Sequence, residues 1–205
     1  MTEASALAKL LRPAIKNERV LAAIAAIPRD RFVPAGERGR AYENIALPIG
    51  SGQTISQPLV VARMLELLEL RKSDRVLDVG TGSGYHAALL ALLAGEVWTI
   101  ERHDKLALEA QRAIRGLGIE NVFFAIGDGS AGLPEHAPFD AINIAAATGA
   151  SVAAAIADQL GAGGRLVAPV GVDGQRLTLM RRTAAGLQST MLEPVRFVPL
   201  IVRED

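Results

Sequence analysis

Three glycines, Gly80, Gly82 and Gly84, lie in the sequence VLDVGTGSGY, between an apolar run and an Ala- and Leu-rich stretch. Glycines at this spacing permit a tight turn and let backbone N–H groups approach a ligand, and the N-terminus of a following helix attracts a negative group. A dinucleotide fingerprint would require a glycine where Tyr85 stands, and a P-loop would require a closing Gly-Lys-Ser/Thr, which is absent. The loop is therefore typical neither of NAD-binding nor of ATP-binding proteins.

Carboxylates stand in or after three successive strand-like runs. Glu101 closes the second run, about 20 residues past the first glycine, where a carboxylate can accept hydrogen bonds from a ribose diol. Asp128 follows the third run, and Asp78 lies inside the first. Together these groups suit a nucleoside that carries a carboxylate and no phosphate, which is the shape of S-adenosyl-L-methionine. The predicted cofactor site comprises Asp78, Gly80, Thr81, Gly82, Ser83, Gly84, Glu101, Asp128 and Gly129.

Each of these features also has a local interpretation. A glycine loop can be a simple turn, and Asp128 between two glycines can shape one. Glu101 can pair with Arg102 or Lys105. Their conjunction at successive strand ends favours the cofactor site over the separate local roles.

The elements that must position this site alternate between strand and helix. Strands are predicted at 75–79, 96–100, 121–126, 139–144 and 164–170, and helices at 85–94, 104–116 and 150–160. Such repetition predicts parallel strands with helices on both faces, because a parallel crossover needs a dozen or more residues. The expected fold class is α/β, a doubly wound, mostly parallel sheet.

An N-terminal extension precedes this core. Apolar residues at helical spacing predict two short helices within 5–27, separated at Pro13. From 28 to 58 prolines and glycines recur without a sustained period, which predicts a loop with no regular structure of its own. Long loops of this kind are usually functional, and residues 40–58 are the part in which we expect a functional role. A further helix is predicted from Pro58, which suits a first helical turn.

The C-terminal residues predict two more strands, at 175–182 and 189–201, separated by the turn-like TAAG. They can pair as an antiparallel hairpin at the edge of the sheet. We expect one domain over 1–205. It would consist of an N-terminal helical and substrate-loop segment (1–70), a cofactor-binding core (71–170) and the hairpin (171–205).

Composition excludes several classes of protein. Among 205 residues there is no cysteine and only three histidines, so a disulfide framework, a thiolate nucleophile or a metal site is not expected. The formal net charge is zero, which argues against a nucleic-acid or membrane-surface partner. No secretory signal or membrane-spanning run is apparent, so a cytoplasmic location is the expectation. A monomer is also expected.

Four segments together resemble the protein-L-isoaspartate O-methyltransferases. They are AYENIALPIGSGQTIS (41–56), VLDVGTGSGY (76–85), IGDGSAGLPEHAPFDAI (126–142) and GGRLVAPVG (163–171). The most specific is LPIGSGQTIS, since similar glycine loops occur in many methyltransferases. The resemblance implies a Rossmann-like methyltransferase fold and protein repair. In that reaction a methyl group passes from S-adenosyl-L-methionine to the free alpha-carboxylate of an L-isoaspartyl residue in a damaged protein or peptide, leaving S-adenosyl-L-homocysteine.

The resemblance also assigns Ser56 to the active site, and Thr54 is a second neutral donor in the same segment. A carboxylate is already ionised at pH 7, since its reference pKa is about 3.5 to 4, so no strong general base is required. Ser56 does not lie in a G-x-S-x-G elbow and is not expected to be a nucleophile. It could also be the N-cap of the helix from Pro58. His86 is expected to be a packing or hydrogen-bonding residue.

Several positions depart from the family pattern. Leu59 stands where many relatives have histidine, Ser51 and Ser130 where an aromatic residue is frequent, and Ala145 where threonine is common. These changes concern the acceptor more than the cofactor. They keep open an enzyme of the same fold that methylates another carboxylate or a small molecule, or a non-catalytic cofactor-binding relative. The Asn/Asp-Pro-Pro-aromatic motif of amino-methylating nucleic-acid enzymes is absent after the fourth strand.

Overall fold

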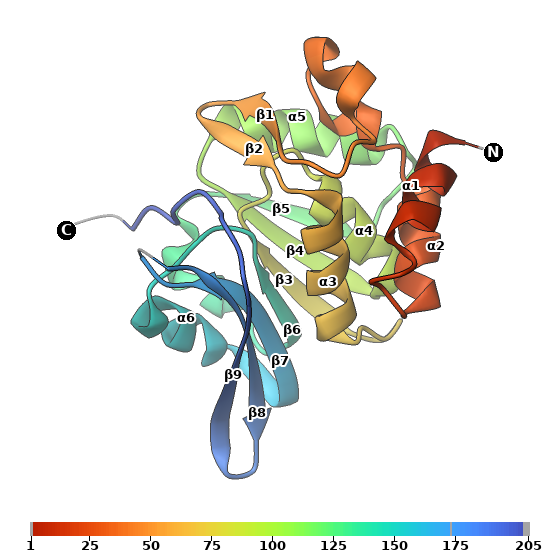
Figure 1. Cartoon of the computed structure of the whole chain (residues 1–205). Helices are drawn as coiled ribbons and strands as arrows, with labels where there is room; N and C mark the ends of the chain where they lie inside the picture. Colours follow the sequence, from red (N-terminus) through yellow and green to blue (C-terminus); the bar gives the residue numbers. More distant parts are fainter. Residues whose placement is uncertain (1, 173, 203–205) are drawn as a thin grey trace.

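The computed structural model describes residues 2–172 and 174–202, and its centre is a seven-stranded sheet (Figure 1). The strands are β3 (Arg75–Val79), β4 (Glu96–Glu101), β5 (Val122–Ile126), β6 (Phe139–Ile144), β7 (Leu160–Val170), β8 (Arg176–Thr183) and β9 (Gly186–Pro194). Their order is β5-β4-β3-β6-β7-β8-β9. The first five are parallel to one another, whereas β8 is antiparallel to β7 and to β9. The mostly parallel sheet with an antiparallel hairpin is confirmed.

Helices cover both faces of this sheet. They are α1 (Glu3–Leu11), α2 (Glu18–Ala26), α3 (Pro58–Leu68), α4 (Tyr85–Leu93), α5 (Asp104–Arg115) and α6 (Ala150–Ala157). Residues of α1 to α5 share one buried cluster, and α6 contributes to a second. Within β3, Val76 belongs to the first cluster and Leu77 to the second, as the alternation of strand side chains requires. The doubly wound arrangement is therefore confirmed.

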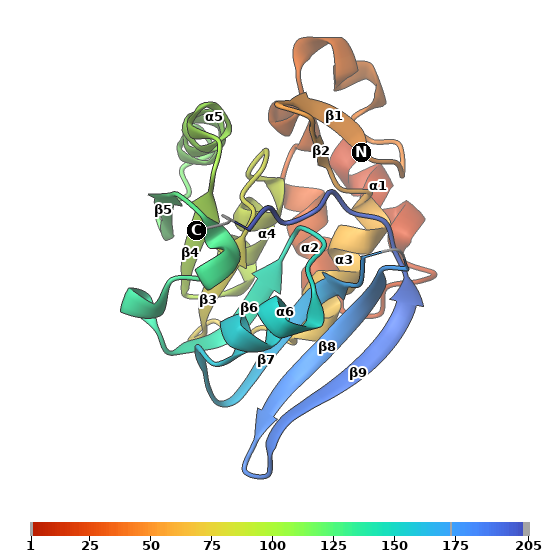
Figure 2. The same cartoon turned by 90° about the vertical axis from the view of Figure 1, so that its left-hand side faces the viewer.

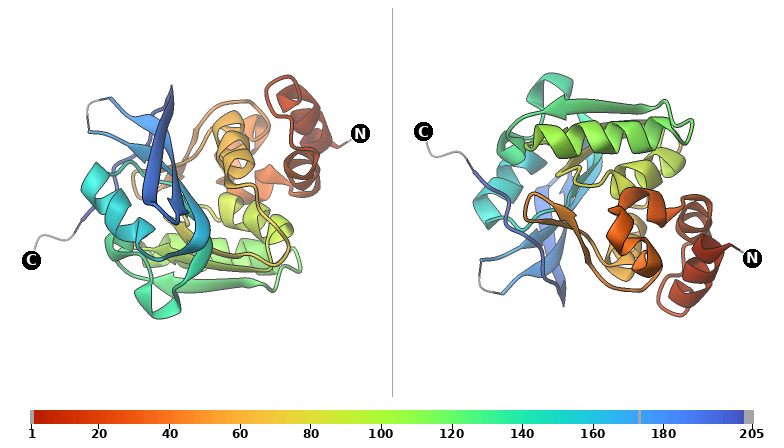
Figure 3. Two further views of the ribbon diagram at one scale, coloured as in Figure 1. Left: turned by 90° about the horizontal axis from the view of Figure 1, so that it is seen from below. Right: turned by 90° about the horizontal axis from the view of Figure 1, so that it is seen from above.

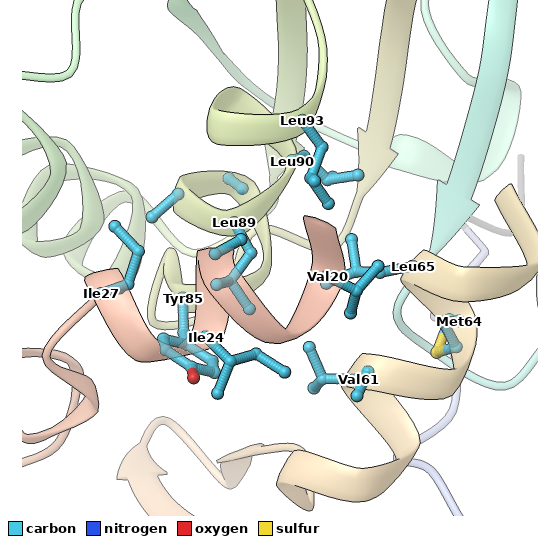
Figure 4. Packing of buried hydrophobic residues seen from close by; sticks show 14 of the residues in the cluster. Val20, Ile24, Ile27, Val61, Met64, Leu65, Tyr85, Leu89, Leu90 and Leu93 are labelled. Carbon is cyan, nitrogen blue, oxygen red and sulfur yellow. The ribbon is translucent and has the colours of Figure 1, made fainter. Parts of the chain in front are cut away.

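The N-terminal helices pack outside α3 and α4 (Figure 3). Thr2 caps α1 by accepting a hydrogen bond from the Ser5 N–H, and Asn17 caps α2 in the same way. Figure 4 shows apolar side chains of α2, α3 and α4 converging, with Ile24, Val61 and Leu89 among them. The two predicted helices are confirmed, and this packing joins the N-terminal extension to the core.

The segment 28–58 has more structure than the sequence predicts. It contains two short 3-10 helices, Arg29–Phe32 and Ala35–Arg40, and an antiparallel hairpin of β1 (Leu47–Gly50) and β2 (Gln53–Ile55). The expectation of a loop without structure of its own is wrong here. Four- and three-residue strands are too short to produce a visible alternation. The hairpin stands above the carboxyl ends of β3 and β4 (Figure 1).

Two predicted boundaries are also wrong. Strand β7 begins at Leu160, not 164, because the glycine-rich run after Leu160 forms an irregularity inside the strand, between the pairs Phe139–Leu160 and Ala141–Arg165. Strand β9 spans Gly186–Pro194 and not 189–201. Proline 194 has no N–H to extend the ladder. The chain beyond it crosses the top edge of the sheet (Figure 2), where Ala147 and Val198 share a backbone hydrogen bond of 2.8 Å.

Candidate active site

The glycine loop follows β3 at the point where the sheet order reverses, between β3 and β6. In open α/β sheets this switch point is the usual ligand crevice. Gly80, Gly82 and Gly84 have φ angles of 91°, 53° and 88°, in the left-handed region. A Cβ atom at Gly84 would lie 2.9 Å from the Cβ of Ala110 on α5. Gly84 therefore permits close packing of α4 on α5, while the earlier glycines shape the turn at the crevice.

The carboxyl ends of four parallel strands line a cleft beside this loop. Five residues of the predicted cofactor site contribute to its walls: Gly80, Gly82, Glu101, Asp128 and Gly129. The sequence reasoning missed other wall residues: Gln53, His103, Ala146 and the segment 198–201. The segment 198–201 is apolar and its sequence is typical of a strand, so its composition does not indicate that it lines a ligand site.

Glu101 fixes the glycine loop from the neighbouring strand. Its Oε2 accepts a 2.9 Å hydrogen bond from the Gly82 N–H, and its Oε1 accepts one of 3.0 Å from the His103 N–H. The side chain is buried and its partners are backbone amides, so the pairing considered with Arg102 or Lys105 is not the one that forms. A carboxylate held by two amides at the cleft wall presents its remaining lone pairs to a ligand.

Asp128 shapes the next strand end. Its Oδ1 accepts a 2.8 Å hydrogen bond from the Ser130 N–H, and it begins the short 3-10 turn Gly129–Ala131. A Cβ atom on Gly129 would lie 2.8 Å from Val79 Cγ1, which is closer than packing allows. The turn role weighed from the sequence is therefore real. It coexists with a place on the cleft wall, which both residues share.

Asp78 lies beneath the loop rather than in the cleft wall. It is fully buried, and its two oxygens accept hydrogen bonds from Asn143 Nδ2 at 2.7 Å and Thr99 Oγ1 at 2.9 Å. Thr81 Oγ1 lies 2.6 Å from Thr99 Oγ1, so the loop connects to the same network. Burial raises the pKa of Asp78 to about 6. Asp78 thus supports the loop from within the sheet.

His86 completes this network from α4. Its Nδ1 lies 3.3 Å from Asn143 Nδ2, an amide donor, so Nδ1 accepts and the proton lies on Nε2. Burial lowers the pKa of His86 to about 3, and the ring is neutral at physiological pH. The predicted hydrogen-bonding role is confirmed.

A second cleft adjoins the first. Ser56 and Gln57 line it on one side and the C-terminal segment 194–198 on the other. Thr54 lines both clefts. A smaller cavity between Ser56 and the glycine loop includes Thr81, Ser83 and His86 in its walls. Thr54 therefore lies where the two clefts meet, and Ser56 lies between the second cleft and the glycine loop.

Ser56 does not cap α3. The N-cap residue is Gln57, whose side chain makes no capping hydrogen bond, and the Leu59 N–H donates to Asn44 Oδ1 at 2.9 Å instead. The N-cap interpretation of Ser56 is wrong, because the donor in the first turn is satisfied by a residue from the preceding loop. The Ser56 side chain, half-buried, is left for the cleft.

Two further properties bear on the kind of site. Within residues 2–172 and 174–202, no three His, Asp or Glu side chains gather closely enough to hold a metal ion. None of the described helices has the length and apolarity needed to cross a bilayer.

Comparisons with known proteins agree on one family. Residues 2–205 match the family model for protein-L-isoaspartate(D-aspartate) O-methyltransferase. The chain is 50% identical over 193 residues to the protein-L-isoaspartate O-methyltransferase of Shewanella amazonensis, covering 94% of this chain and 91% of that protein. It is 51% identical to the enzyme of that name from Roseiflexus castenholzii, covering 94% and 88%.

Solved structures show the same fold. A protein-L-isoaspartate O-methyltransferase structure superposes with a TM-score of 0.86 at 30% identity, over 95% of this chain and 64% of that chain. A putative enzyme of this type from Plasmodium falciparum, solved with S-adenosyl-L-homocysteine, has a TM-score of 0.83 at 24% identity and covers 98% and 99%. The resemblance in the four sequence segments thus extends over nearly the whole length, and the chain belongs to the protein-L-isoaspartate O-methyltransferase family.

Proposed function

We propose that residues of the two adjoining clefts carry out the reaction of this family. The chain transfers the methyl group of S-adenosyl-L-methionine to the free alpha-carboxylate of L-isoaspartyl residues in proteins and peptides. The observation that carries this proposal is the position of Thr54, which lines the cleft beside the glycine loop and the cleft beside Ser56. Ala145 and Val198 also line both clefts, so ligands bound in the two clefts would meet beside these three residues.

The first cleft fits the cofactor. Gly80 and Gly82 expose backbone at its wall, Glu101 offers carboxylate oxygens to a ribose diol, and Asp128 with Gly129 extends the same wall. Thr81, Ser83, Gly84 and Asp78 hold the loop in shape. When bound, S-adenosyl-L-methionine supplies a sulfonium methyl group that a carboxylate oxygen can attack, and S-adenosyl-L-homocysteine is the product.

The second cleft fits the acceptor. Ser56 and Thr54 are neutral hydroxyl donors that can hold the isoaspartyl carboxylate by hydrogen bonds. No general base is needed, because that carboxylate is already ionised at neutral pH. One carboxylate oxygen forms the new C–O bond as the C–S bond breaks, so a positive and a negative charge are both lost. Orientation is then the main contribution, and intramolecular models allow about 7 to 11 kcal/mol for it.

The proposal also covers the domain organisation of the chain, its partners and its location in the cell. Residues 1–70 supply the acceptor segment, 71–170 the cofactor site and 171–205 the hairpin that leads to the shared wall, all within one domain. Isoaspartyl proteins and peptides are the partners, and nucleic acid and membranes are not. The chain acts as a cytoplasmic monomer without a metal ion. Of the departures from the family pattern, Ala145 lines both clefts.

Two matched peptides test the function. They are identical except that one contains an L-isoaspartyl residue where the other contains an aspartyl residue, and each is incubated with S-adenosyl-L-methionine labelled in the methyl group. The proposal predicts alkali-labile label on the isoaspartyl peptide alone. Label on neither peptide, with S-adenosyl-L-homocysteine still bound, would instead indicate another acceptor or a non-catalytic relative.

A further inference from the structure

Arg29 is a fully buried cation at the start of the segment that leads to Ser56. Its Nη1 donates to the Ala41 carbonyl, and its Nη2 donates to the carbonyls of Ile45 and Ser56, each at 3.1 Å. In the described part of the chain no carboxylate forms an ion pair with it. One guanidinium group thus joins two carbonyls near the beginning of the stretch 41–56 to the carbonyl at its end.

The same guanidinium also faces the helix that follows the glycine loop. Its Cζ lies 5.8 Å from the ring centroid of Tyr85, the first residue of α4. Phe32 packs on that ring edge-on, with the centroids 5.6 Å apart. Tyr85 directly follows Gly84 and is itself buried. Arg29 therefore contacts both the acceptor segment and the helix that begins at the cofactor loop.

Burying the Arg29 cation in this way costs stability, so stability alone does not explain the arrangement. Burial lowers the pKa of Arg29 to about 10, which records the penalty of removing a cation from water. Buried charges are often replaced by apolar residues without loss of stability, so a buried charge is weak evidence for a stabilising role. A planar fork of five N–H donors is, however, well suited to fixing several carbonyl groups in one geometry.

We propose that Arg29 is a positioning residue for methyl transfer, which acts by holding the Ser56 backbone so that the Ser56 hydroxyl faces the acceptor cleft. This inference rests on the proposed function of Ser56. Arg29 lines neither of the two adjoining clefts nor the smaller cavity beside Ser56, so it acts through Ser56 and not on the substrate. Lysine could not replace it, because a single ammonium group lacks the fork that reaches three carbonyls.

A double-mutant cycle in the full-length protein tests the inference. Arg29→Lys, Ser56→Ala and the double variant are compared by kcat and KM on an isoaspartyl peptide, with S-adenosyl-L-homocysteine affinity measured by calorimetry. Arg29→Lys is expected to lower kcat about tenfold while cofactor-product affinity changes less than about twofold. In the Ser56→Ala background, Arg29→Lys is expected to lower kcat by less than about twofold, since the group it positions is gone.

Tyr42→Phe is the matched control. The Tyr42 hydroxyl donates a 2.7 Å hydrogen bond to Asp30, so the change loosens the same segment without touching the Ser56 carbonyl. It is expected to lower the melting temperature but to leave kcat within about twofold. Equal losses of kcat in Tyr42→Phe and Arg29→Lys would overturn the inference, because general loosening would then explain both.

The outcomes separate the two proposals. If Ser56→Ala keeps full kcat, the proposed role of Ser56 fails, and with it this inference. If Ser56→Ala loses kcat but Arg29→Lys costs as much in that background as in the wild type, only the inference fails. If Arg29→Lys does not fold, a second variant tests the same hydrogen bond. In it, an ester replaces the amide between residues 56 and 57, which makes the Ser56 carbonyl a weaker acceptor for Arg29. The inference then requires a fall in kcat of about twofold or more, and an unchanged kcat overturns it.

Discussion

Asp78 and Asn143 face each other across β3 and β6, and the Asn143 Nδ2 donates a 2.7 Å hydrogen bond to the Asp78 carboxylate. The pair lies just before the glycine loop, where these neighbouring strands open the cleft. Because Asp78 also accepts from Thr99 on β4, one buried carboxylate links three strands below the proposed cofactor site. Its ionisation should therefore be visible in the stability of the protein.

The pH dependence of that ionisation has a definite sign. The pKa of Asp78 is raised from 3.8 to about 6 in the folded protein. Between these values the folded state holds a proton that the unfolded chain has released, so this group's contribution to the free energy of unfolding falls as pH rises. In Asp78→Asn that fall is absent. Urea unfolding should show the stability of the variant relative to wild type improving by about 2 kcal/mol from pH 4 to pH 7.

Parallel stability curves for wild type and Asp78→Asn over that range would contradict the shift. The comparison must be between variant and wild type, because other carboxyl groups titrate in the opposite sense. Hydrogen bonds to Glu66 from two backbone amides and Arg63 hold the pKa of that carboxyl below its ordinary value, against the effect of burial.

Gly84→Ala should damage the loop by a steric route. The new Cβ would lie 2.9 Å from Ala110 Cβ, so α4 and α5 must move apart. We expect a loss of about 2 to 4 kcal/mol in the free energy of unfolding, together with weaker S-adenosyl-L-homocysteine binding. Gly118→Ala is the matched control, since Gly118 also has a positive φ, 72°, but has no neighbouring atom within 4 Å of the new Cβ. Equal losses in the two variants would show that backbone strain, and not the contact with α5, is what matters.

Glu101→Gln should weaken the cofactor site. Glutamine keeps the size of the side chain but has one acceptor oxygen, so it cannot serve the Gly82 and His103 amides and a ribose diol together. Calorimetry should show S-adenosyl-L-homocysteine binding about tenfold or more weaker, and unfolding should show a loss of about 1 to 3 kcal/mol because one buried amide loses its acceptor. The control is Glu109→Gln on the outer surface of α5, whose nearest ion-pair partner is Lys105 at 4.0 Å. Undiminished affinity in Glu101→Gln would remove Glu101 from the cofactor site.

Much of the fold follows from the sequence because its signals are local. Alternating apolar runs of five or six residues, separated by helical stretches, are sufficient to place β3 to β6 and the helices between them. The bounds of β7 and β9 could not be placed in the same way. A glycine run usually marks a turn, and here it lies within β7. The residues after Pro194 are apolar enough for a strand, but they pair with Ala147 at an isolated bridge and not along a ladder.

The site divides along the same line. Gly80, Glu101 and Asp128 could be found from the sequence because each follows a recognisable strand. Arg29 could not, because its partners are backbone carbonyls up to 27 residues away, and carbonyls have no sequence signature. The 198–201 wall of the cofactor cleft depends in the same way on a backbone bond, between Ala147 and Leu200 at 2.7 Å.

The central claim is that Ser56 acts on the acceptor and not on the cofactor. Its most direct test is the single-turnover rate of methyl transfer from pre-bound S-adenosyl-L-methionine to a saturating isoaspartyl peptide, in wild type and Ser56→Ala. Loss of one orienting hydroxyl should slow this step about 10- to 100-fold, with S-adenosyl-L-homocysteine affinity unchanged. An unchanged rate, or a loss confined to cofactor affinity, would contradict the account.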